Sequence, residues 1–130
     1  MTSSHRILGK AIAGFAWAAV TCATPLTSWA NPNPDLPTPI EKMQMPAYCH
    51  DGGNAITAAC GPFMNHYCSG LNFLNRANNA KFDKEARRHY LRRGRVDMDY
   101  TLNKMAPTCK FAADINATNS RMKITEMLLK

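Results

Sequence analysis

The first thirty residues set the conditions under which the rest of the chain folds. They contain the basic residues Arg6 and Lys10, an apolar run over residues 11–20 and the small-x-small sequence SWA at residues 28–30. A basic region, a short apolar region and small residues at a cleavage position are typical of a secretory signal peptide. The apolar run is too short to cross a membrane as a helix. The sequence therefore predicts a signal peptide over residues 1–30.

Cleavage after Ala30 would leave a mature chain that begins at Asn31. An earlier cleavage after Ala23 also fits the small residues there, and an uncleaved anchor is the alternative to a removable signal. We expect an exported protein in the periplasm, with the extracellular space as the alternative. We expect no transmembrane segment after cleavage.

Four cysteines remain in the predicted mature chain, namely Cys49, Cys60, Cys68 and Cys109. An even number of cysteines in an oxidising compartment indicates two disulfides, for which three pairings exist. About one hundred residues is close to the size at which a hydrophobic core alone is marginal, so covalent crosslinks have a physical role. The same four residues in a reducing compartment would suggest zinc.

The predicted mature chain is basic. Of the sixteen Lys and Arg in the whole chain, Arg6 and Lys10 belong to the signal, so fourteen remain against nine Asp and Glu. A helical face of this charge can meet an acidic protein, an anionic lipid or polysaccharide, or nucleic acid, although nucleic acid is not expected for an exported chain. A solvated face without a partner is the plain alternative. The excess gathers at Arg87, Arg88, Arg92, Arg93 and Arg95.

Residues 31–46 contain five prolines. Proline fixes its own φ angle, lacks an N–H donor and biases the preceding residue toward extended conformations. We therefore expect an extended, proline-rich arm outside the folded unit. A small domain over residues 47–130 would follow it.

The spacing of apolar positions predicts three helices in this domain. They cover residues 62–79, residues 84–105 and residues 114–130, and Asp83 and Asp114 are the expected capping residues of the last two. The apolar stripes consist of Met64, Tyr67, Leu71, Leu74 and Ala77 in the first helix and of Ala86, Tyr90, Gly94, Met98, Leu102 and Met105 in the second.

The first two helices are joined by a short connection and are expected to pack as an antiparallel hairpin. Gly94 would weaken the second helix by about 1 kcal/mol relative to alanine. We expect its lack of a side chain to allow a close approach of the first helix near Leu71 or Leu74, and ordinary local weakness is the alternative. The residues expected to hold the hairpin are Tyr67, Leu71, Tyr90, Gly94 and Met98.

Antiparallel packing also bears on the disulfides. Cys68 lies near the start of the first helix and Cys109 follows the end of the second, so the two ends would be neighbours. This arrangement favours a Cys68–Cys109 bridge and leaves Cys49 with Cys60. The other two pairings stay open, because they depend on geometry that the sequence does not contain.

The two long helices carry aromatic, small and apolar residues in a defined order. An aromatic residue, a small residue and a leucine occur in the first helix, and a small, a large apolar and a small residue precede a proline in the second. The residues concerned are Tyr67, Gly70, Leu71, Gly94, Met98, Thr101 and Pro107. This order resembles the tetratricopeptide-type helical hairpin found in small exported proteobacterial proteins. Such hairpins generally bind other proteins, so the resemblance implies a scaffold or adaptor.

Repeats of this kind normally need about three copies to bury their apolar faces. One hairpin with one further helix leaves apolar surface without a neighbour. We therefore expect the third helix to be the docking face for a partner protein or for a second copy of the chain.

Met43, Met45 and His50 provide soft thioether and imidazole ligands, which in an exported protein favour Cu(I). A periplasmic copper- or other metal-binding protein is therefore the alternative function. The sequence contains no haem-attachment motif, redox Cys-x-x-Cys pair, nucleophile elbow or phosphate loop. We expect neither enzymatic activity nor a cofactor.

Together these patterns predict an all-α domain, stapled by two disulfides, in which a helical hairpin and a third helix follow a proline-rich arm. The expected function is that of an exported protein-interaction module. Its partner would be another protein, of acidic character, and a homo-oligomer is the alternative. The basic face offered to that partner would consist of Arg87, Arg88, Arg92 and Arg95.

Overall fold

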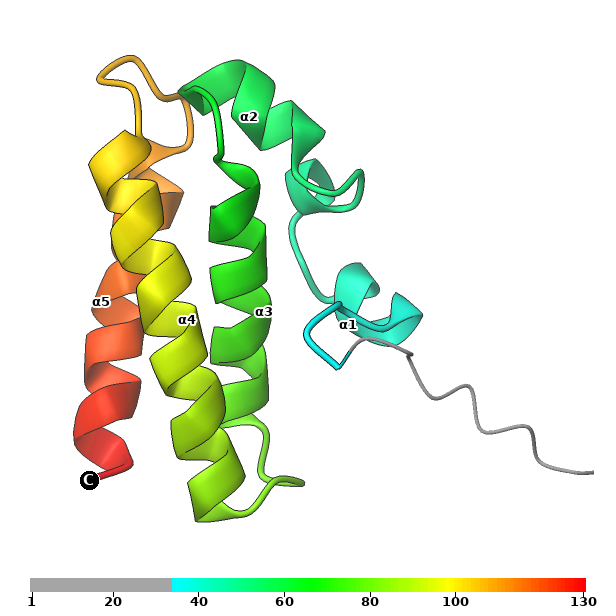
Figure 1. The fold of residues 1–130 in the computed structure, drawn as a ribbon, viewed down its shortest axis with the longest axis vertical. Coiled ribbons are helices and arrows are strands. Elements are labelled where there is room, and N and C mark those ends of the chain that lie inside the picture. The colour runs from blue at the N-terminus through cyan, green and yellow to red at the C-terminus, as the bar shows by residue number, and fades with distance from the viewer. Residues whose placement is uncertain (1–33) are drawn as a thin grey trace, which may run out of the picture. The chain divides into compact units, whose positions relative to one another are not determined.

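The computed structural model describes residues 34–130, which contain helices and connecting segments and no strand. The all-α prediction is confirmed. The predicted signal peptide lies outside the described residues. In chain order (Figure 1) the elements are α1 (Pro39–Met43), the 3-10 turn η1 (Ala47–Cys49), α2 (Asn54–Cys60), α3 (Asn65–Asn78), α4 (Lys84–Lys104) and α5 (Ala112–Leu128).

An antiparallel hairpin of α3 and α4 forms the centre of this unit, and α5 packs beside it (Figure 1). Helix α4 begins where the sequence predicts, because a side-chain oxygen of Asp83 accepts a hydrogen bond from the backbone N–H of Ala86 at 2.8 Å. The hydroxyl groups of Tyr67 and Thr118 lie 3.0 Å apart and join α3 to α5. The predicted hairpin with a third helix is confirmed.

Two helix starts differ from the prediction. Helix α3 begins at Asn65 rather than at Pro62, because residues 62–64 form turns in which Phe63 has a φ of 67°. Helix α5 begins at Ala112, so Asp114 lies inside its first turn and does not cap it. An acidic residue in the first turn still interacts favourably with the positive end of the helix dipole.

Helices α3 and α4 approach most closely where Gly70 faces Gly94. A Cβ atom added to Gly94 would lie 3.1 Å from the carbonyl oxygen of Gly70 and 3.2 Å from the Cβ of Phe73. The expected close approach at Gly94 is therefore present. The facing residues, Gly70 and Phe73, each come one position before the expected neighbours Leu71 and Leu74.

The residues expected to hold the hairpin occupy two environments. Tyr67, Leu71, Gly94 and Met98 are buried. Tyr90 is half-buried, and its ring centre lies 5.0 Å from that of Phe82. The aromatic side chain just before the α4 cap thus packs onto the first turns of that helix, as in a hydrophobic staple.

Both expected disulfides are present, but the favoured pairing is wrong. The structure pairs Cys49 with Cys68 and Cys60 with Cys109, with Cα–Cα distances of 5.5 and 4.1 Å. Helix α2 meets the segment that follows α4 (Figure 1), where the carbonyl of Cys60 accepts a hydrogen bond from the N–H of Ala106 at 2.9 Å. This contact brings Cys60 to Cys109. Cys68 is left to face η1, which contains Cys49.

The arm also differs from the expectation, because part of it is helical and packs on the domain. A side-chain oxygen of Glu41 accepts the N–H of Thr38 at 2.8 Å, and the Thr38 hydroxyl accepts the N–H of Glu41 at 3.3 Å. This capping box, with Pro39 in the first turn, starts α1. Met45, after the helix, is only 6% exposed. We use "the arm" below for residues 34–46.

Candidate functional site

Arg76 of α3 holds the arm against the domain. Its side chain is 7% exposed, and Nε and Nη2 donate hydrogen bonds to the two carboxylate oxygens of Glu41 at 2.6 and 2.9 Å. Nη2 also donates to the carbonyl of Leu36 at 3.0 Å, and Nη1 donates to the carbonyl of Pro34. One buried cation therefore binds a carboxylate and two main-chain carbonyls of the arm. We call this set of contacts the Arg76 clamp.

The clamp changes the acidity of both partners. Hydrogen bonds from Arg76 lower the pKa of Glu41 from 4.5 to about 2, although burial acts in the opposite direction. The hydrogen bonds to Glu41 raise the pKa of Arg76. The pair is consequently ionised throughout the neutral pH range. Charge-assisted, two-pronged contacts of this kind are among the stronger hydrogen bonds in proteins.

Acid is expected to weaken the docking of the arm. Since the pKa of Glu41 is lower in the folded chain than in the unfolded chain, its stabilising contribution is complete above about pH 4.5 and is lost as the pH falls through about 2. We expect Glu41→Gln to be less stable than the unaltered chain at pH 6, and the difference to shrink steadily toward pH 2. Urea unfolding at a series of pH values measures this. A difference that is independent of pH would contradict the clamp.

Three residues of the predicted basic face are engaged within the domain. The Nε of Arg87 donates to the carbonyl of Ala77 at 2.7 Å, and the Nε of Arg88 donates to the carbonyl of Leu129 at 2.6 Å. These carbonyls lie at the C-terminal ends of α3 and α5, where cations satisfy unpaired carbonyls and the helix dipole. Arg95 binds the side chain of Asn119 at 2.6 Å and that of Asp99 at 2.9 Å.

Arg92 and Arg93 are the exposed members of the same segment. Arg93 pairs with Asp35 of the arm at 3.1 Å, and both side chains are about half exposed. Arg92 is exposed and has no hydrogen bond or ion pair with any residue from 34 to 130. Among the four residues predicted to meet a partner, Arg92 is the one whose charge is available.

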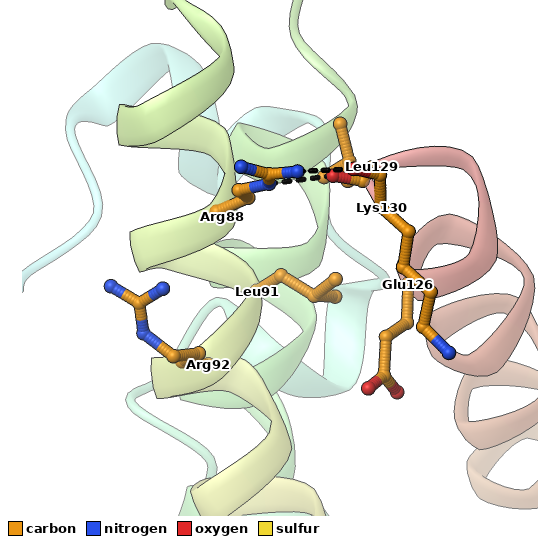
Figure 2. Close-up of a pocket in the computed structure, with 6 residues that line it drawn as sticks. All are labelled: Arg88, Leu91, Arg92, Glu126, Leu129 and Lys130. Atoms are coloured by element: carbon orange, nitrogen blue, oxygen red, sulfur yellow. Dashed lines mark hydrogen bonds between the residues drawn. The ribbon is translucent and has the colours of Figure 1, made fainter.

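An open groove of about 440 Å³ runs between α4 and α5 (Figure 2). Its floor contains the buried side chains of Leu91 and Leu129. Figure 2 shows Arg88 reaching across to the end of α5, whereas the guanidinium of Arg92 points away from that helix. The groove is lined by Arg88, Leu91, Arg92, Glu126, Leu129 and Lys130.

The same helix α5 carries large apolar side chains on its outer surface. Ile124 is 52% exposed, Met127 is 64% exposed and Leu128 is 76% exposed. Their spacing of three and four residues places them on one face of the helix. We call them the α5 apolar face. The α5 side of the groove is formed by Glu126, Leu129 and Lys130, which are neighbours of Met127 and Leu128 in the chain. The α5 apolar face, the groove and Arg92 are the candidate interaction surface.

A polar cluster joins α3 to α4 beside the glycine contact. The carboxylate of Asp97 accepts a hydrogen bond from the Ser69 hydroxyl at 2.6 Å and lies 2.8 Å from Nδ1 of His66. The serine binds the carboxylate rather than the imidazole, so the cluster lacks the Ser–His contact of a hydrolytic triad. The cluster therefore fastens the two helices together.

The predicted copper ligands lie in different environments. Met43 is 80% exposed and Met45 is 6% exposed. The Nε2 atom of His50 lies 2.9 Å from the carbonyl oxygen of Met45, which engages this ring nitrogen with the backbone. Within residues 34–130, no group of three or more His, Cys, Asp and Glu side chains is arranged to hold a metal ion.

No protein-family model, curated protein or solved structure matches the chain. The tetratricopeptide-like character of the hairpin therefore stays a prediction. In the part of the chain that the structure describes, no helix is both long and apolar enough to span a membrane.

Proposed function

We propose that the chain is an exported protein-interaction module, a scaffold or adaptor that binds an acidic partner protein through α5. The observation that carries this proposal is the α5 apolar face, on which three large side chains are more than half exposed. Exposed apolar residues gathered on one helix face are typical of docking surfaces. The proposed role is binding rather than catalysis and needs no cofactor.

The charge of the neighbouring groove supports an acidic partner. Arg92 has no internal partner among the described residues, and it lines the α4 side of the groove with its guanidinium directed away from α5. A charged rim around an apolar centre gives orientation and speed of association, while the apolar centre gives most of the affinity. We therefore assign the apolar contact to the α5 face and the recognition of acidic groups to Arg92.

Site-specific photo-crosslinking tests this surface. A crosslinkable residue at Leu128, in the chain purified without reductant from its own compartment, is expected to give a discrete adduct with a partner protein. Arg92→Glu is expected to lower the yield of this adduct about tenfold, because it replaces attraction with repulsion. Arg88 is unsuitable for this test, since its guanidinium caps α5.

Lys104→Glu makes the same change of charge on α4 without touching the groove and serves as the matched control. It should leave the yield unchanged, and circular dichroism should show equal helicity for both variants. An adduct of twice the mass of the chain would identify a second copy as the partner. No adduct from Leu128, or equal yields from the two charge variants, would reject the proposal.

A further inference from the structure

The contact between the arm and α3 is held by polar groups and buries little apolar surface. Helix α1 has no buried residue, and Ile40 and Met43 are 70% and 80% exposed. The hydrophobic effect therefore contributes little to the docking of α1. The Arg76 clamp and the buried Met45 side chain make the main attachments.

The same contact is also incompletely packed. A cavity of about 210 Å³ lies between the arm and α3, whereas α3 and α4 touch closely enough to exclude a Cβ atom at their crossing. This pocket is partly open to solvent, and across it the arm and α3 do not make the dispersion contacts of a closely packed interface. The residues around the cavity are Asp35, Leu36, Pro37, Lys42, Met45, Cys49, Gly52, Asn65, Cys68 and Ser69.

Asn72 adds a second sign that the arm is an imperfect occupant. Its side chain is 1% exposed, and neither the amide oxygen nor the amide nitrogen has a hydrogen-bond partner among residues 34–130. Asn72 lies one turn after Cys68 and one turn before Arg76, hence on the same face of α3. Cys68 borders the cavity and Arg76 binds the arm. A buried amide in this position lowers stability unless another group pairs with it.

We propose that the face of α3 containing Asn72 and Arg76 is a binding groove for an acidic, proline-containing segment of a partner protein. The arm is then an internal occupant that this segment displaces. The proposal rests on the proposed function only in that the ligand is a protein, since the groove is separate from the α5 apolar face.

The arm itself defines the chemistry of the ligand. A carboxylate engages the fork of Arg76, and two main-chain carbonyls of a proline-containing turn, those of Pro34 and Leu36, engage its other N–H groups. Residues 34–36 form a turn and a bend, so these carbonyls lie outside regular secondary structure and can accept the N–H groups of Arg76. A ligand that also paired with Asn72 and filled the cavity would make contacts that the arm does not make. Such a ligand could displace the arm despite the advantage of the tether.

The tether determines how the proposal must be tested. A covalently attached arm competes at a millimolar effective concentration, so a free peptide binds the unaltered chain weakly. Glu41→Gln removes the charged contact of the tethered arm and keeps its length and shape. The tethered arm of this variant competes less strongly with a peptide in solution, while the side chains of the groove on α3 are unchanged.

The experiment is a fluorescence-anisotropy titration of the full mature chain with a fluorescein-labelled peptide of residues 34–46. We expect the Glu41→Gln chain to bind the peptide with a Kd at least tenfold lower than that of the unaltered chain. A peptide that itself carries Glu41→Gln should bind at least tenfold more weakly, because two charge-assisted hydrogen bonds are lost. Adding Arg76→Lys to the chain should give the same loss, since lysine lacks the planar fork.

Equal affinities for the unaltered and Glu41→Gln chains would overturn the proposal, and so would equal affinities for the two peptides. Comparing the two peptides on one protein does not depend on the folding of the Arg76→Lys variant. The peptide is not expected to touch Ile124, Met127 or Leu128, so failure of the titration would leave the proposed docking surface standing. Failure of the Leu128 crosslink would, in turn, leave this groove standing.

Discussion

Replacing both Cys60 and Cys109 with alanine is expected to lower the free energy of unfolding by about 4 kcal/mol. This disulfide joins residues 49 positions apart, and the chain-entropy model gives a stabilisation of about 4 kcal/mol for a loop of that size. A domain of about one hundred residues has a total stability of roughly 5–15 kcal/mol. The variant would therefore lose a large part of its stability. Urea unfolding without reductant, followed by circular dichroism, measures the change.

The second disulfide provides the matched comparison. Cys49 and Cys68 are 19 positions apart, and their replacement with alanine is expected to cost about 3 kcal/mol on the same model. The longer bridge should thus be the more important one. A larger loss from the Cys49 and Cys68 pair, or no loss from either, would contradict this ranking. Peptide mapping of the oxidised chain would test the pairing itself.

Substitution of Gly94 by valine is expected to lower the free energy of unfolding by about 3 kcal/mol. Any Cβ atom at this position would lie 3.1 Å from the carbonyl oxygen of Gly70, and valine adds two methyl groups beyond it. Overpacking of a tight contact typically costs about 1–3 kcal/mol, and the atoms here include backbone that cannot turn aside. The midpoint of thermal unfolding should fall accordingly, while the far-ultraviolet spectrum at low temperature stays helical.

Two further substitutions separate packing from helix propensity. Asn103→Val places the same side chain at an exposed position of α4 and should change stability by less than about 0.5 kcal/mol. Gly94→Ala should fall between the two valine variants. Alanine strains the same contact less, and its helix propensity exceeds that of glycine by about 1 kcal/mol. If Gly94→Val were as stable as Asn103→Val, the close approach would have no energetic importance.

Local patterns predicted the helical framework well. The apolar stripes of α3 and α4 repeat at helical spacing, and Asp83 supplies a capping side chain, so both helices could be located to within a few residues. Gly94 was also informative, because a glycine in the middle of a buried stripe weakens a helix unless another backbone comes close. These features depend on neighbours along the chain, which a sequence displays directly.

The disulfide pairing could not be derived in the same way. It depends on the path of α2, which ends at Cys60 beside the segment after α4. Gly61, with a φ of 109°, then turns the chain out of α2. Antiparallel packing of two helices predicts which of their ends are neighbours. It does not predict which third segment covers those ends.

The Arg76 clamp, helix α1 and the packing of the arm on the domain were not predicted, for a similar reason. Thr38 and Glu41 have the spacing of a capping box, which predicts a helix start. The five prolines of residues 31–46 favoured an extended arm instead. Arg76 sits in α3 beside the buried Ala77, yet its carboxylate partner is 35 positions away. The basic segment shows the opposite problem, because counting charges does not reveal that Arg87 and Arg88 bind helix-end carbonyls.

The two disulfides overlap along the chain, since Cys60 lies between Cys49 and Cys68 while its partner, Cys109, lies beyond both. If the chain is exported as we propose, translocation from the N-terminus exposes Cys49 and Cys60 to oxidants first, and these two thiols are not partners in the folded domain. A bridge formed in order of emergence would therefore have to be broken by thiolate attack before the domain could mature. Production of this protein would then depend on a disulfide isomerase, and a stronger oxidant alone would lower the yield.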